Sequence, residues 1–258
     1  MTTASATQTV LITGATGGIG GALVDSYAQP GNTLILQGRN AARLAQQAAL
    51  CEARGARVLT QVLDVRDRTA LSVWLRNVCA QEVIDLLIVN AGVNTNTGPD
   101  GTGERWEDIE ALIDVNVLAA MATVDGVLPS MRARGAGQIA LISSLAAYFG
   151  LPVTPSYCAS KAAVKVYGEA LRGWLAPEGV RVNVVMPGYV ESQMCHDMPG
   201  PKPFLWPADK AVRYIRQGLE RNRPRISFPF PLNFGTWWLS VLPPAISQRI
   251  LLLIGYRG

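Results

Sequence analysis

Residues 13–20 read Thr13-Gly14-Ala15-Thr16-Gly17-Gly18-Ile19-Gly20, between an apolar run, Thr9–Thr13, and a stretch with helical spacing, Gly20–Gln29. Glycines let the chain turn sharply and let backbone N–H groups come close to a bound anion. The N-terminus of a helix adds a favourable partial positive charge at the same place. The segment therefore predicts a strand, a tight turn and a helix that bind a pyrophosphate, and a tight turn without a ligand is the alternative.

The rest of the chain alternates between apolar runs and helical stretches. The runs rich in β-branched residues are Thr9–Thr13, Thr33–Leu36, Arg57–Leu63, Asp85–Val89, Gln138–Ile142 and Val180–Val185. The stretches with helical spacing are Gly20–Gln29, Ala41–Arg54, Asp67–Gln81, Trp106–Arg132 and Ser156–Leu175. Apolar strands separated by helices are typical of a parallel sheet covered on both faces. The pattern predicts an α/β fold with a doubly wound, Rossmann-type parallel sheet.

The 258 residues allow one large domain. No internal repeat or Ser/Gly-rich linker is present, so we expect a single cofactor-binding and catalytic domain over residues 1–230, closed by a strand at Ile226–Phe230. Residues 231–258 form an apolar extension in which Pro243-Pro244 separates two short predicted helices. No stretch of this tail is apolar over a length that spans a bilayer.

The tail has three possible roles that the sequence does not distinguish. Its helices could lie in a membrane interface, with the tryptophans and Arg249 or Arg257 at the level of the headgroups. They could instead form a subunit interface, or a lid over the substrate pocket.

Composition excludes several other classes of protein. The net charge is +4, but Lys and Arg are scattered, so we expect no nucleic-acid partner. Cys51, Cys79, Cys158 and Cys195 form no CxxC pair, and His196 is the single histidine, so no metal site is expected. The polar N-terminal residues do not resemble a signal peptide, which makes a cytoplasmic location the expectation.

Four further motifs follow the glycine turn in order. They are Asp64-Val65 after the third predicted strand, Asn90-Ala91-Gly92 after the fourth, Ser144 with Tyr157 and Lys161, and Pro187-Gly188 with Val190 and Ser192. Together with the TGxxxGxG spacing of residues 13–20, this ordered set resembles the motifs of the short-chain dehydrogenases/reductases. Ser192 stands where that family usually has threonine.

The resemblance implies a hydride-transferring oxidoreductase with a nicotinamide cofactor, assembled as a homodimer or homotetramer. It assigns to the cofactor site Gly14, Thr16, Gly17, Gly18, Ile19, Gly20, Asp64, Val65, Asn90, Ala91, Gly92, Tyr157, Lys161, Pro187, Gly188, Val190 and Ser192. It assigns catalysis to Ser144, Tyr157 and Lys161, with Asn116 holding a water in a proton relay to Lys161, which also reaches the nicotinamide ribose.

The end of the second predicted strand indicates which nicotinamide cofactor binds. An acidic side chain there would accept hydrogen bonds from the adenosine ribose of NAD and repel a 2′-phosphate. The sequence has Gln37-Gly38-Arg39-Asn40, so Gly38 stands in the place of the carboxylate and Arg39 follows. Arginine can form two parallel hydrogen bonds with a phosphate. We therefore expect NADP(H) to be favoured over NAD(H).

Tyr157 and Lys161 are four residues apart, which places them on one face of a helix. A free tyrosine has a pKa of about 10, too high for an effective base near neutral pH. A nearby ammonium favours the phenolate, so we expect Lys161 to lower the pKa of Tyr157. Alternation along a strand lets only one of Ser143 and Ser144 face the site, and the family's spacing selects Ser144, which would hydrogen-bond the substrate oxygen.

Large apolar side chains are frequent in the segments expected to contact substrate. They are Tyr148, Phe149, Leu151, Tyr189, Met194, Met198, Phe204 and Trp206. Few charges interrupt them, so an apolar ketone or aldehyde, or its alcohol, is expected rather than a carboxylated or phosphorylated compound. The alternatives are a non-redox relative such as an epimerase or dehydratase, and a non-catalytic NADP(H)-binding sensor or membrane-docked interaction protein.

Overall fold

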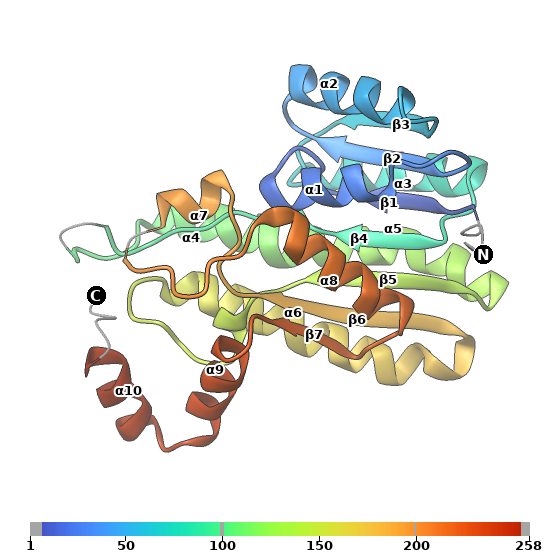
Figure 1. Ribbon diagram of the computed structural model, residues 1–258. Coiled ribbons are helices and arrows are strands. Elements are labelled where there is room, and N and C mark those ends of the chain that lie inside the picture. The colour runs from blue at the N-terminus through green and yellow to red at the C-terminus, as the bar shows by residue number, and fades with distance from the viewer. Residues whose placement is uncertain (1–6, 99–100, 199, 254–258) are drawn as a thin grey trace.

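The computed structural model describes residues 7–98, 101–198 and 200–253 and contains a seven-stranded parallel sheet in the order β3-β2-β1-β4-β5-β6-β7 (Figure 1). The strands are β1 (Thr9–Ile12), β2 (Thr33–Gly38), β3 (Arg57–Val62), β4 (Leu86–Val89), β5 (Gly137–Ile142), β6 (Val180–Pro187) and β7 (Arg225–Phe228). This order confirms the predicted doubly wound fold. The strands are added in one direction from β1 to β3 and in the opposite direction from β4 to β7, so the order reverses between β1 and β4, where such folds bind ligands. Expectations for residues 1–6, Pro199 and Arg257 lie outside the described residues.

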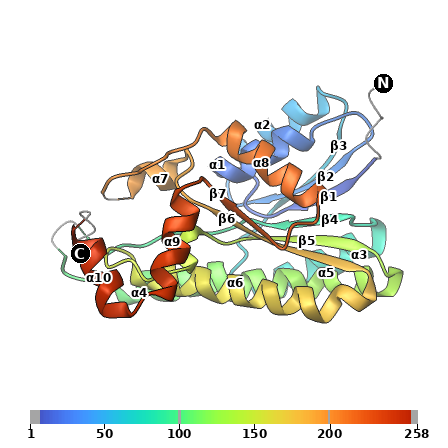
Figure 2. The same ribbon diagram turned by 60° about the horizontal axis from the view of Figure 1, so that its bottom comes forward.

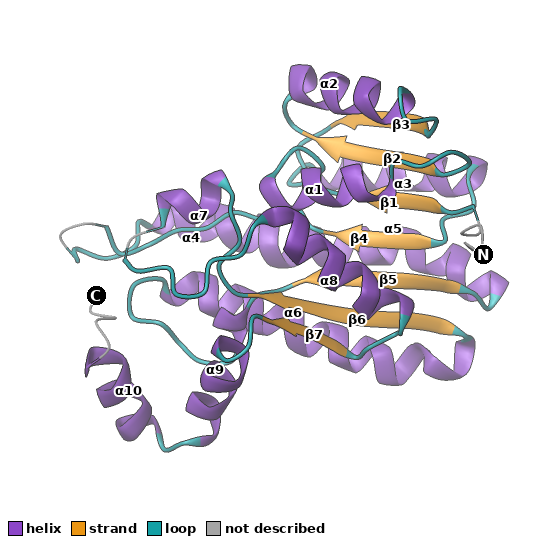
Figure 3. Ribbon diagram, in the orientation of Figure 1, coloured by secondary structure: helices purple, strands orange, loops and turns teal. Residues whose placement is uncertain are grey.

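Helices cover both faces of the sheet (Figures 1 and 3). The helices are α1 (Gly18–Tyr27), α2 (Ala41–Glu52), α3 (Arg68–Gln81), α4 (Trp106–Ile113), α5 (Ala120–Arg134), α6 (Pro155–Leu175), α7 (Gln193–Asp197), α8 (Ala208–Glu220), α9 (Leu232–Val241) and α10 (Pro244–Leu253). Helices α1, α2 and α8 pack on one face, and α3, α5 and α6 pack on the other. Burial of alternate strand side chains on both faces explains why the strands read as continuous apolar runs.

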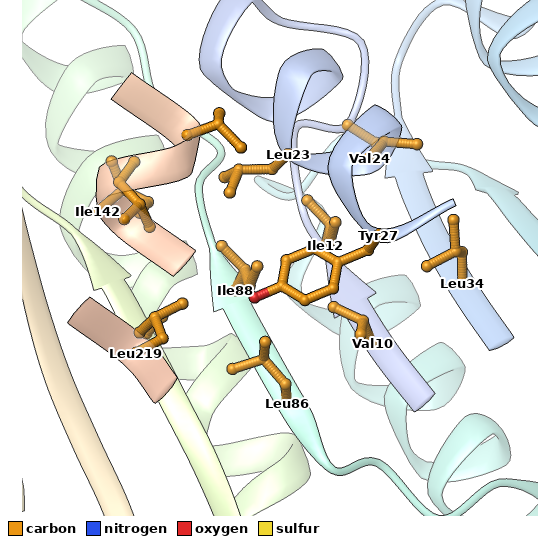
Figure 4. Packing of buried hydrophobic residues seen from close by; sticks show 14 of the residues in the cluster. Val10, Ile12, Leu23, Val24, Tyr27, Leu34, Leu86, Ile88, Ile142 and Leu219 are labelled. Carbon is orange, nitrogen blue, oxygen red and sulfur yellow. The ribbon is translucent and has the colours of Figure 1, made fainter. Parts of the chain in front are cut away.

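The core on the α1 and α8 face is built from side chains far apart in the sequence. Val10 and Ile12 of β1 pack with Leu34 of β2 and with Leu86 and Ile88 of β4 (Figure 4). These side chains are buried, and α1 and α8 close the layer above them. This packing fixes the position of the carboxyl end of β1, and therefore of the glycine turn that follows it.

One long helix crosses the other face. Helices α4 and α5 are joined without a break by a π-helical segment, Asp114–Ala119. Helix α5 ends at Arg134 and is capped by Gly135 in the left-handed conformation (φ 61°). By length and composition Trp106–Arg134 is apolar enough to cross a membrane, but half of its most apolar window is buried against the sheet and α6. Its apolar character is accounted for by this packing.

Several boundaries differ from the predicted ones. Strand β2 continues to Gly38 because its last residues pair with β3, and β7 ends at Phe228, before the first of two prolines. Helix α8 is not predicted from the sequence, although its buried residues Ala211, Val212, Ile215 and Leu219 recur with helical spacing.

The tail forms the two expected short helices, separated at Pro243. They project from the carboxyl edge of the sheet beyond β7, and Figure 2 shows them standing against each other as a hairpin. Helix α9 contacts β7 and the short 3-10 turn Leu145–Ala147 that follows β5. The start of the tail is thereby brought to the end of the sheet where the predicted catalytic residues lie.

Candidate active site

The glycine turn between β1 and α1 is tightly packed. Gly14 has φ 65°, and a Cβ there would lie 2.8 Å from the Cα of Ala91. A Cβ on Gly18 would lie 2.3 Å from the Cβ of Ser192, and one on Gly20 would lie 2.1 Å from the carbonyl oxygen of Gly14. The turn therefore requires glycine at three positions, for conformation at one and for space at all three.

Gln37 of β2 and Asn90, the residue after β4, hold this turn in place. The Asn90 amide donates to the carbonyl oxygens of Thr13 (3.1 Å) and Gly14 (3.0 Å), and the Thr13 hydroxyl accepts from the backbone N–H of Asn90 and Ala91. The buried Gln37 side chain accepts from the Gly14 N–H at 3.0 Å. Asn90 thus lines the site and also fixes the shape of the phosphate-binding turn.

One continuous cavity of about 670 Å³ extends along the carboxyl ends of the strands. Its lining contains every residue predicted to bind the cofactor: Gly14, Thr16, Gly17, Gly18, Ile19, Gly20, Arg39, Asp64, Val65, Asn90, Ala91, Gly92, Tyr157, Lys161, Pro187, Gly188, Val190 and Ser192. Ser144 lines the same cavity. Residues separated by up to 178 positions, such as Gly14 and Ser192, are thus brought to one site, although their individual roles stay predictions.

One end of the cavity is positively charged. Arg39 and Arg43 line it beside the N-terminus of α2, where the Asn40 side chain caps the helix by accepting from the Arg43 N–H at 2.9 Å. The Asp64 carboxylate is held by Arg66 at 2.7 Å, and this hydrogen-bonded pairing holds the pKa of Asp64 below its usual range. Two guanidinium groups and a helix N-terminus make this end suited to an anionic group.

The donor set and the space fit a nicotinamide dinucleotide. The positive end suits a phosphorylated adenosine, the glycine turn at the start of α1 suits a pyrophosphate, and the cavity then continues to Tyr157 and Lys161. Its volume lies within the range of about 300–1,000 Å³ typical of small-molecule sites. The residues that would hold the cofactor are those already named along the lining.

Tyr157 and Lys161 lie on one face of α6, as their spacing predicts. Lys161 is buried, its Nζ donates to the carbonyl oxygen of Ile142 at 3.0 Å, and it lies 5.6 Å from the centre of the Tyr157 ring. Burial lowers the pKa of Lys161 to about 8. Desolvation disfavours the charged form of both groups, so it lowers the pKa of Lys161 and raises the pKa of Tyr157.

The expected lowering of the Tyr157 pKa is wrong for this structure. Burial raises the pKa of Tyr157 to about 12, and hydrogen bonding with Ser144 opposes that rise only in part. Desolvation of the phenol is the largest cause of the rise, and the neighbouring thiols of Cys158 and Cys195 act in the same direction. Tyr157 therefore keeps its proton at neutral pH and is suited to donate it.

Ser143 and Ser144 point to different partners. The Ser143 hydroxyl is buried and donates to the Lys161 carbonyl oxygen at 2.7 Å, which joins β5 to α6. The Ser144 hydroxyl accepts from the Ala146 N–H at 3.1 Å and is hydrogen-bonded with the Tyr157 phenol. Ser144 is therefore the serine whose hydroxyl is placed beside Tyr157.

Asn116 lies behind the cavity wall instead of lining it. The π-helical segment turns its side chain to the backbone of Val93, which accepts from the amide at 2.9 Å and donates to it at 2.8 Å, and the amide also donates to the Ser160 hydroxyl. A Cβ on Gly92 would lie 3.3 Å from the Asn116 oxygen and 3.4 Å from Lys161 Nζ. The Asn116 oxygen and Lys161 Nζ thus both lie beside Gly92, and the role of Asn116 in a proton relay stays a prediction.

The other end of the cavity is apolar. Phe149, Leu151, Tyr189, Met194 and Met198 line the cavity, as predicted for substrate contacts. Tyr148, Phe204 and Trp206 do not line it. Tyr148 packs against the small apolar cluster of Leu145, Val184 and Met186, Trp206 stacks on Phe228 with ring centres 5.1 Å apart, and Phe204 is exposed.

The tail supplies the remaining wall of this end. Its lining residues are Leu232, Gly235, Thr236, Trp238, Leu239, Ile250 and Leu251. This contact corresponds to the lid alternative for the tail.

Gln37 and Arg43 are among the polar residues of the site that sequence reasoning missed. Gln37 is a buried polar side chain in an otherwise apolar strand, which is a signal for a structural hydrogen bond. Arg43 follows Arg39 by four residues at the start of a helix, so both can reach the same ligand.

Known proteins with similar sequence and structure agree with this geometry. The family model described as short chain dehydrogenase matches residues 8–201. An uncharacterized oxidoreductase of Myxococcus xanthus is 35% identical over 237 residues, covering 92% of this chain and 93% of that protein. The ketoacyl reductase HetN of Nostoc is 36% identical over 188 residues, covering 71% of this chain and 63% of that protein.

A solved structure extends the comparison to nearly the whole chain. The short-chain dehydrogenase from Sphingobium yanoikuyae in complex with NADPH has a TM-score of 0.77 and 26% identity, with 97% of each chain covered. The glycine turn and the ordered motifs, from Gly14 to Ser192, lie within the residues 8–201 that the family model matches. This chain therefore belongs to the short-chain dehydrogenase family and is an oxidoreductase with a site for a nicotinamide cofactor.

Proposed function

We propose that the protein reduces an apolar ketone or aldehyde to its alcohol with NADP(H), and that Tyr157 is the proton donor. The observation that carries this proposal is the composition of the cavity. A protonated phenol, a serine hydroxyl and a buried ammonium, from Tyr157, Ser144 and Lys161, lie between a positively charged end and an uncharged apolar end.

The residues suit proton delivery to a carbonyl oxygen. When bound, a nicotinamide cofactor supplies the hydride that adds to the carbonyl carbon. The developing alkoxide takes the proton of Tyr157, and the Ser144 hydroxyl donates a hydrogen bond to the same oxygen. Lys161, still largely cationic below its pKa of about 8, stabilises the negative charge that forms on Tyr157.

The substrate class follows from what lines the apolar end. Phe149, Leu151, Met194, Met198 and Leu239 are among its side chains, and the charged lining residues that the structure describes, Arg39, Arg43, Asp64 and Lys161, all lie along the cofactor part. A carboxylate or phosphate on the substrate would lose its hydration there without gaining a partner. An apolar carbonyl compound fits this environment better.

Cofactor preference is supported by the positive end of the cavity. Gly38 ends β2 without a carboxylate, Arg39 and Arg43 line the cavity, and the Asp64 carboxylate is occupied by Arg66. A 2′-phosphate would find two guanidinium partners, so we expect NADPH to bind more tightly than NADH. A titration of the protein with each cofactor measures this, and tighter NADH binding would contradict it.

A spectrophotometric screen tests the reaction itself. Ketones and aldehydes of increasing apolar size are offered with NADPH and with NADH, and cofactor oxidation is followed together with formation of the alcohol. We expect turnover with apolar carbonyl compounds and little with carboxylated ones of the same size. NADPH binding without oxidation of the cofactor by any carbonyl would favour a sensor. Product formation without net cofactor consumption would favour an epimerase or dehydratase.

Two further expectations concern the protein as a whole. We expect a homodimer or homotetramer, as in the family that the motifs resemble, and a cytoplasmic location. Mass determination by light scattering and fractionation of cells measure these properties.

A further inference from the structure

Helix α9 presents apolar side chains on two opposite sides. Leu232 and Leu239 face the cavity, and Leu239 is buried. Phe234, Trp237 and Val241 follow one another at spacings of three and four on the other side and are 56%, 41% and 58% exposed. A helix that is apolar all round normally has both sides covered. In the part of the chain that the structure describes, the outer side of α9 stays exposed, with the rings of Phe234 and Trp237 in contact with each other at 5.8 Å between centres.

Helix α10 repeats this arrangement. Ile250 and Leu251 line the cavity, whereas Ile246 and Leu253 are exposed, Leu253 by 85%. Arg249 lies between them at a spacing of three and four and is also exposed. The two outer sides belong to the hairpin that projects beyond the sheet (Figures 1 and 2).

The exposed apolar surface continues around the mouth of the cavity. Trp238 and Met194 line the cavity and are also exposed, so they lie where it opens to solvent. Phe204 and Leu205, after α7, are exposed as well. Helices α7 and α9 therefore each place one exposed apolar side chain, Met194 and Trp238, on the lining of the cavity.

The charge of the hairpin indicates what covers it. Residues 226–253 contain no Asp or Glu, and Arg249 is their single charged side chain. An apolar surface with tryptophans, a cation and no acidic group is complementary to the boundary of a bilayer with anionic headgroups. In water these apolar side chains would stay exposed to solvent, and contiguous exposed apolar surface of this kind usually marks an interaction site.

We propose that the outer sides of α9 and α10 dock the protein on the surface of a lipid bilayer, with Phe234, Trp237 and Leu253 among the inserted side chains. Each helix has ten residues and is about 15 Å long, half the thickness of a bilayer core of about 30 Å. The hairpin therefore lies in the interface and does not span. Docking is independent of the proposed reaction, whereas direct entry of an apolar substrate from the lipid rests on it.

Sedimentation with vesicles tests docking without any turnover. The full chain is mixed with vesicles of phosphatidylcholine, and with vesicles of phosphatidylcholine and phosphatidylglycerol, and the pelleted fraction is measured. We expect binding to both kinds of vesicle and tighter binding to the anionic ones. The triple variant Phe234→Gln, Trp237→Gln, Leu253→Gln should bind more weakly by about tenfold or more.

A matched control removes exposed apolar side chains elsewhere. The triple variant Val62→Gln, Val83→Gln, Trp174→Gln changes residues of similar exposure on other elements and should pellet like the parent. Circular dichroism confirms that each variant folds. Failure of the parent chain to pellet with either vesicle, or equal loss in both triple variants, would overturn the proposal.

Quenching by lipid provides a second measurement on the folded parent chain. Brominated phosphatidylcholine should quench part of the tryptophan fluorescence, and Trp237→Phe should remove part of that quenching. Quenching unchanged by Trp237→Phe would contradict insertion of this side chain. If the first triple variant instead lowers the subunit count by light scattering and the parent binds no vesicle, the surface joins two copies of the chain and the membrane proposal is wrong.

Discussion

The ammonium of Lys161 donates a hydrogen bond to the backbone carbonyl oxygen of Ile142 at 3.0 Å, which joins α6 to the last residue of β5. The contact places a buried cation beside the cavity at the end of the central strands. Keeping a charge in this position opposes folding, because a buried ammonium loses its hydration.

Lys161→Met should therefore change how stability depends on pH. Burial lowers the pKa of Lys161 from 10.5 to about 8, so between these values the unfolded chain binds a proton that the folded chain has lost. The parent becomes more stable as pH rises through this window, by roughly 3 kcal/mol at about 1.4 kcal/mol per pH unit. The free energy of unfolding of the variant relative to the parent should thus fall by a similar amount between pH 8 and 10.5, as measured by urea denaturation. A difference that does not vary with pH would contradict it.

Tyr157→Phe should remove turnover and leave cofactor binding intact. The phenol holds its proton because burial raises its pKa to about 12, and phenylalanine keeps the ring without the proton. We expect kcat to fall by about 10²–10⁴-fold, the usual range for loss of a general acid. Tyr167→Phe, on the same helix but outside the cavity lining, is the matched control and should keep its activity. Equal kcat for parent and Tyr157→Phe would exclude the assigned role.

The two neighbouring serines should separate catalysis from stability. Ser144→Ala removes the hydroxyl beside Tyr157, and we expect a fall in kcat of about 10- to 1,000-fold with little change in the free energy of unfolding. Ser143→Ala removes the buried donor to the Lys161 carbonyl oxygen, and we expect a loss of about 1–2 kcal/mol of stability. Enzyme assays and denaturant unfolding of both variants check the assignment, which fails if the two phenotypes are exchanged.

Alanine substitutions at two glycines of the turn should lower the free energy of unfolding by different amounts. A Cβ at Gly20 would lie 2.1 Å from the Gly14 carbonyl oxygen, so Gly20→Ala must displace backbone and should lose about 2–4 kcal/mol of stability. At Gly17 the nearest such atom is 3.5 Å away, which is ordinary contact, so Gly17→Ala should lose less than about 1 kcal/mol. Denaturant unfolding without cofactor measures both, and equal losses would show that the packing at Gly20 relaxes freely.

Arg43→Gln should weaken NADPH binding selectively. Arg43 lines the positive end of the cavity, and loss of one exposed charge-assisted partner should raise the Kd for NADPH by about 10-fold and the Kd for NADH by less than about 2-fold. Arg54→Gln is the matched control, because Arg54 pairs with Asp25 at 3.0 Å outside the cavity. If the Kd values for NADPH and NADH rise by the same factor, Arg43 does not contact a 2′-phosphate.

Features that are local in the sequence, namely apolar runs, helical spacing and short motifs, explain which parts of the fold and the site could be predicted. Apolar runs bounded by turn residues predicted β1 to β6, and each helix that carries a motif residue was placed from spacing alone. The resemblance of the ordered motifs from Gly14 to Ser192 to those of the family indicated which residues share one cavity, and parallel strands bring these residues together because their carboxyl ends lie at the same edge. The π-helical segment at Asn116 could not be predicted, since its hydrogen bonds to Val93 and Ser160 join distant parts of the chain.

The residues of the chain by themselves determined the parallel sheet and the glycine turn, because these depend on short-range spacing and backbone conformation. The catalytic and cofactor-site candidates came from the resemblance of the ordered motifs to those of the short-chain dehydrogenases/reductases. Only the tertiary structure decided that the pKa of Tyr157 rises, that Gln37 holds the turn and that the tail forms a wall of the cavity. Desolvation is a sum over every atom that surrounds a group, and those atoms come from segments that only the folded chain brings together.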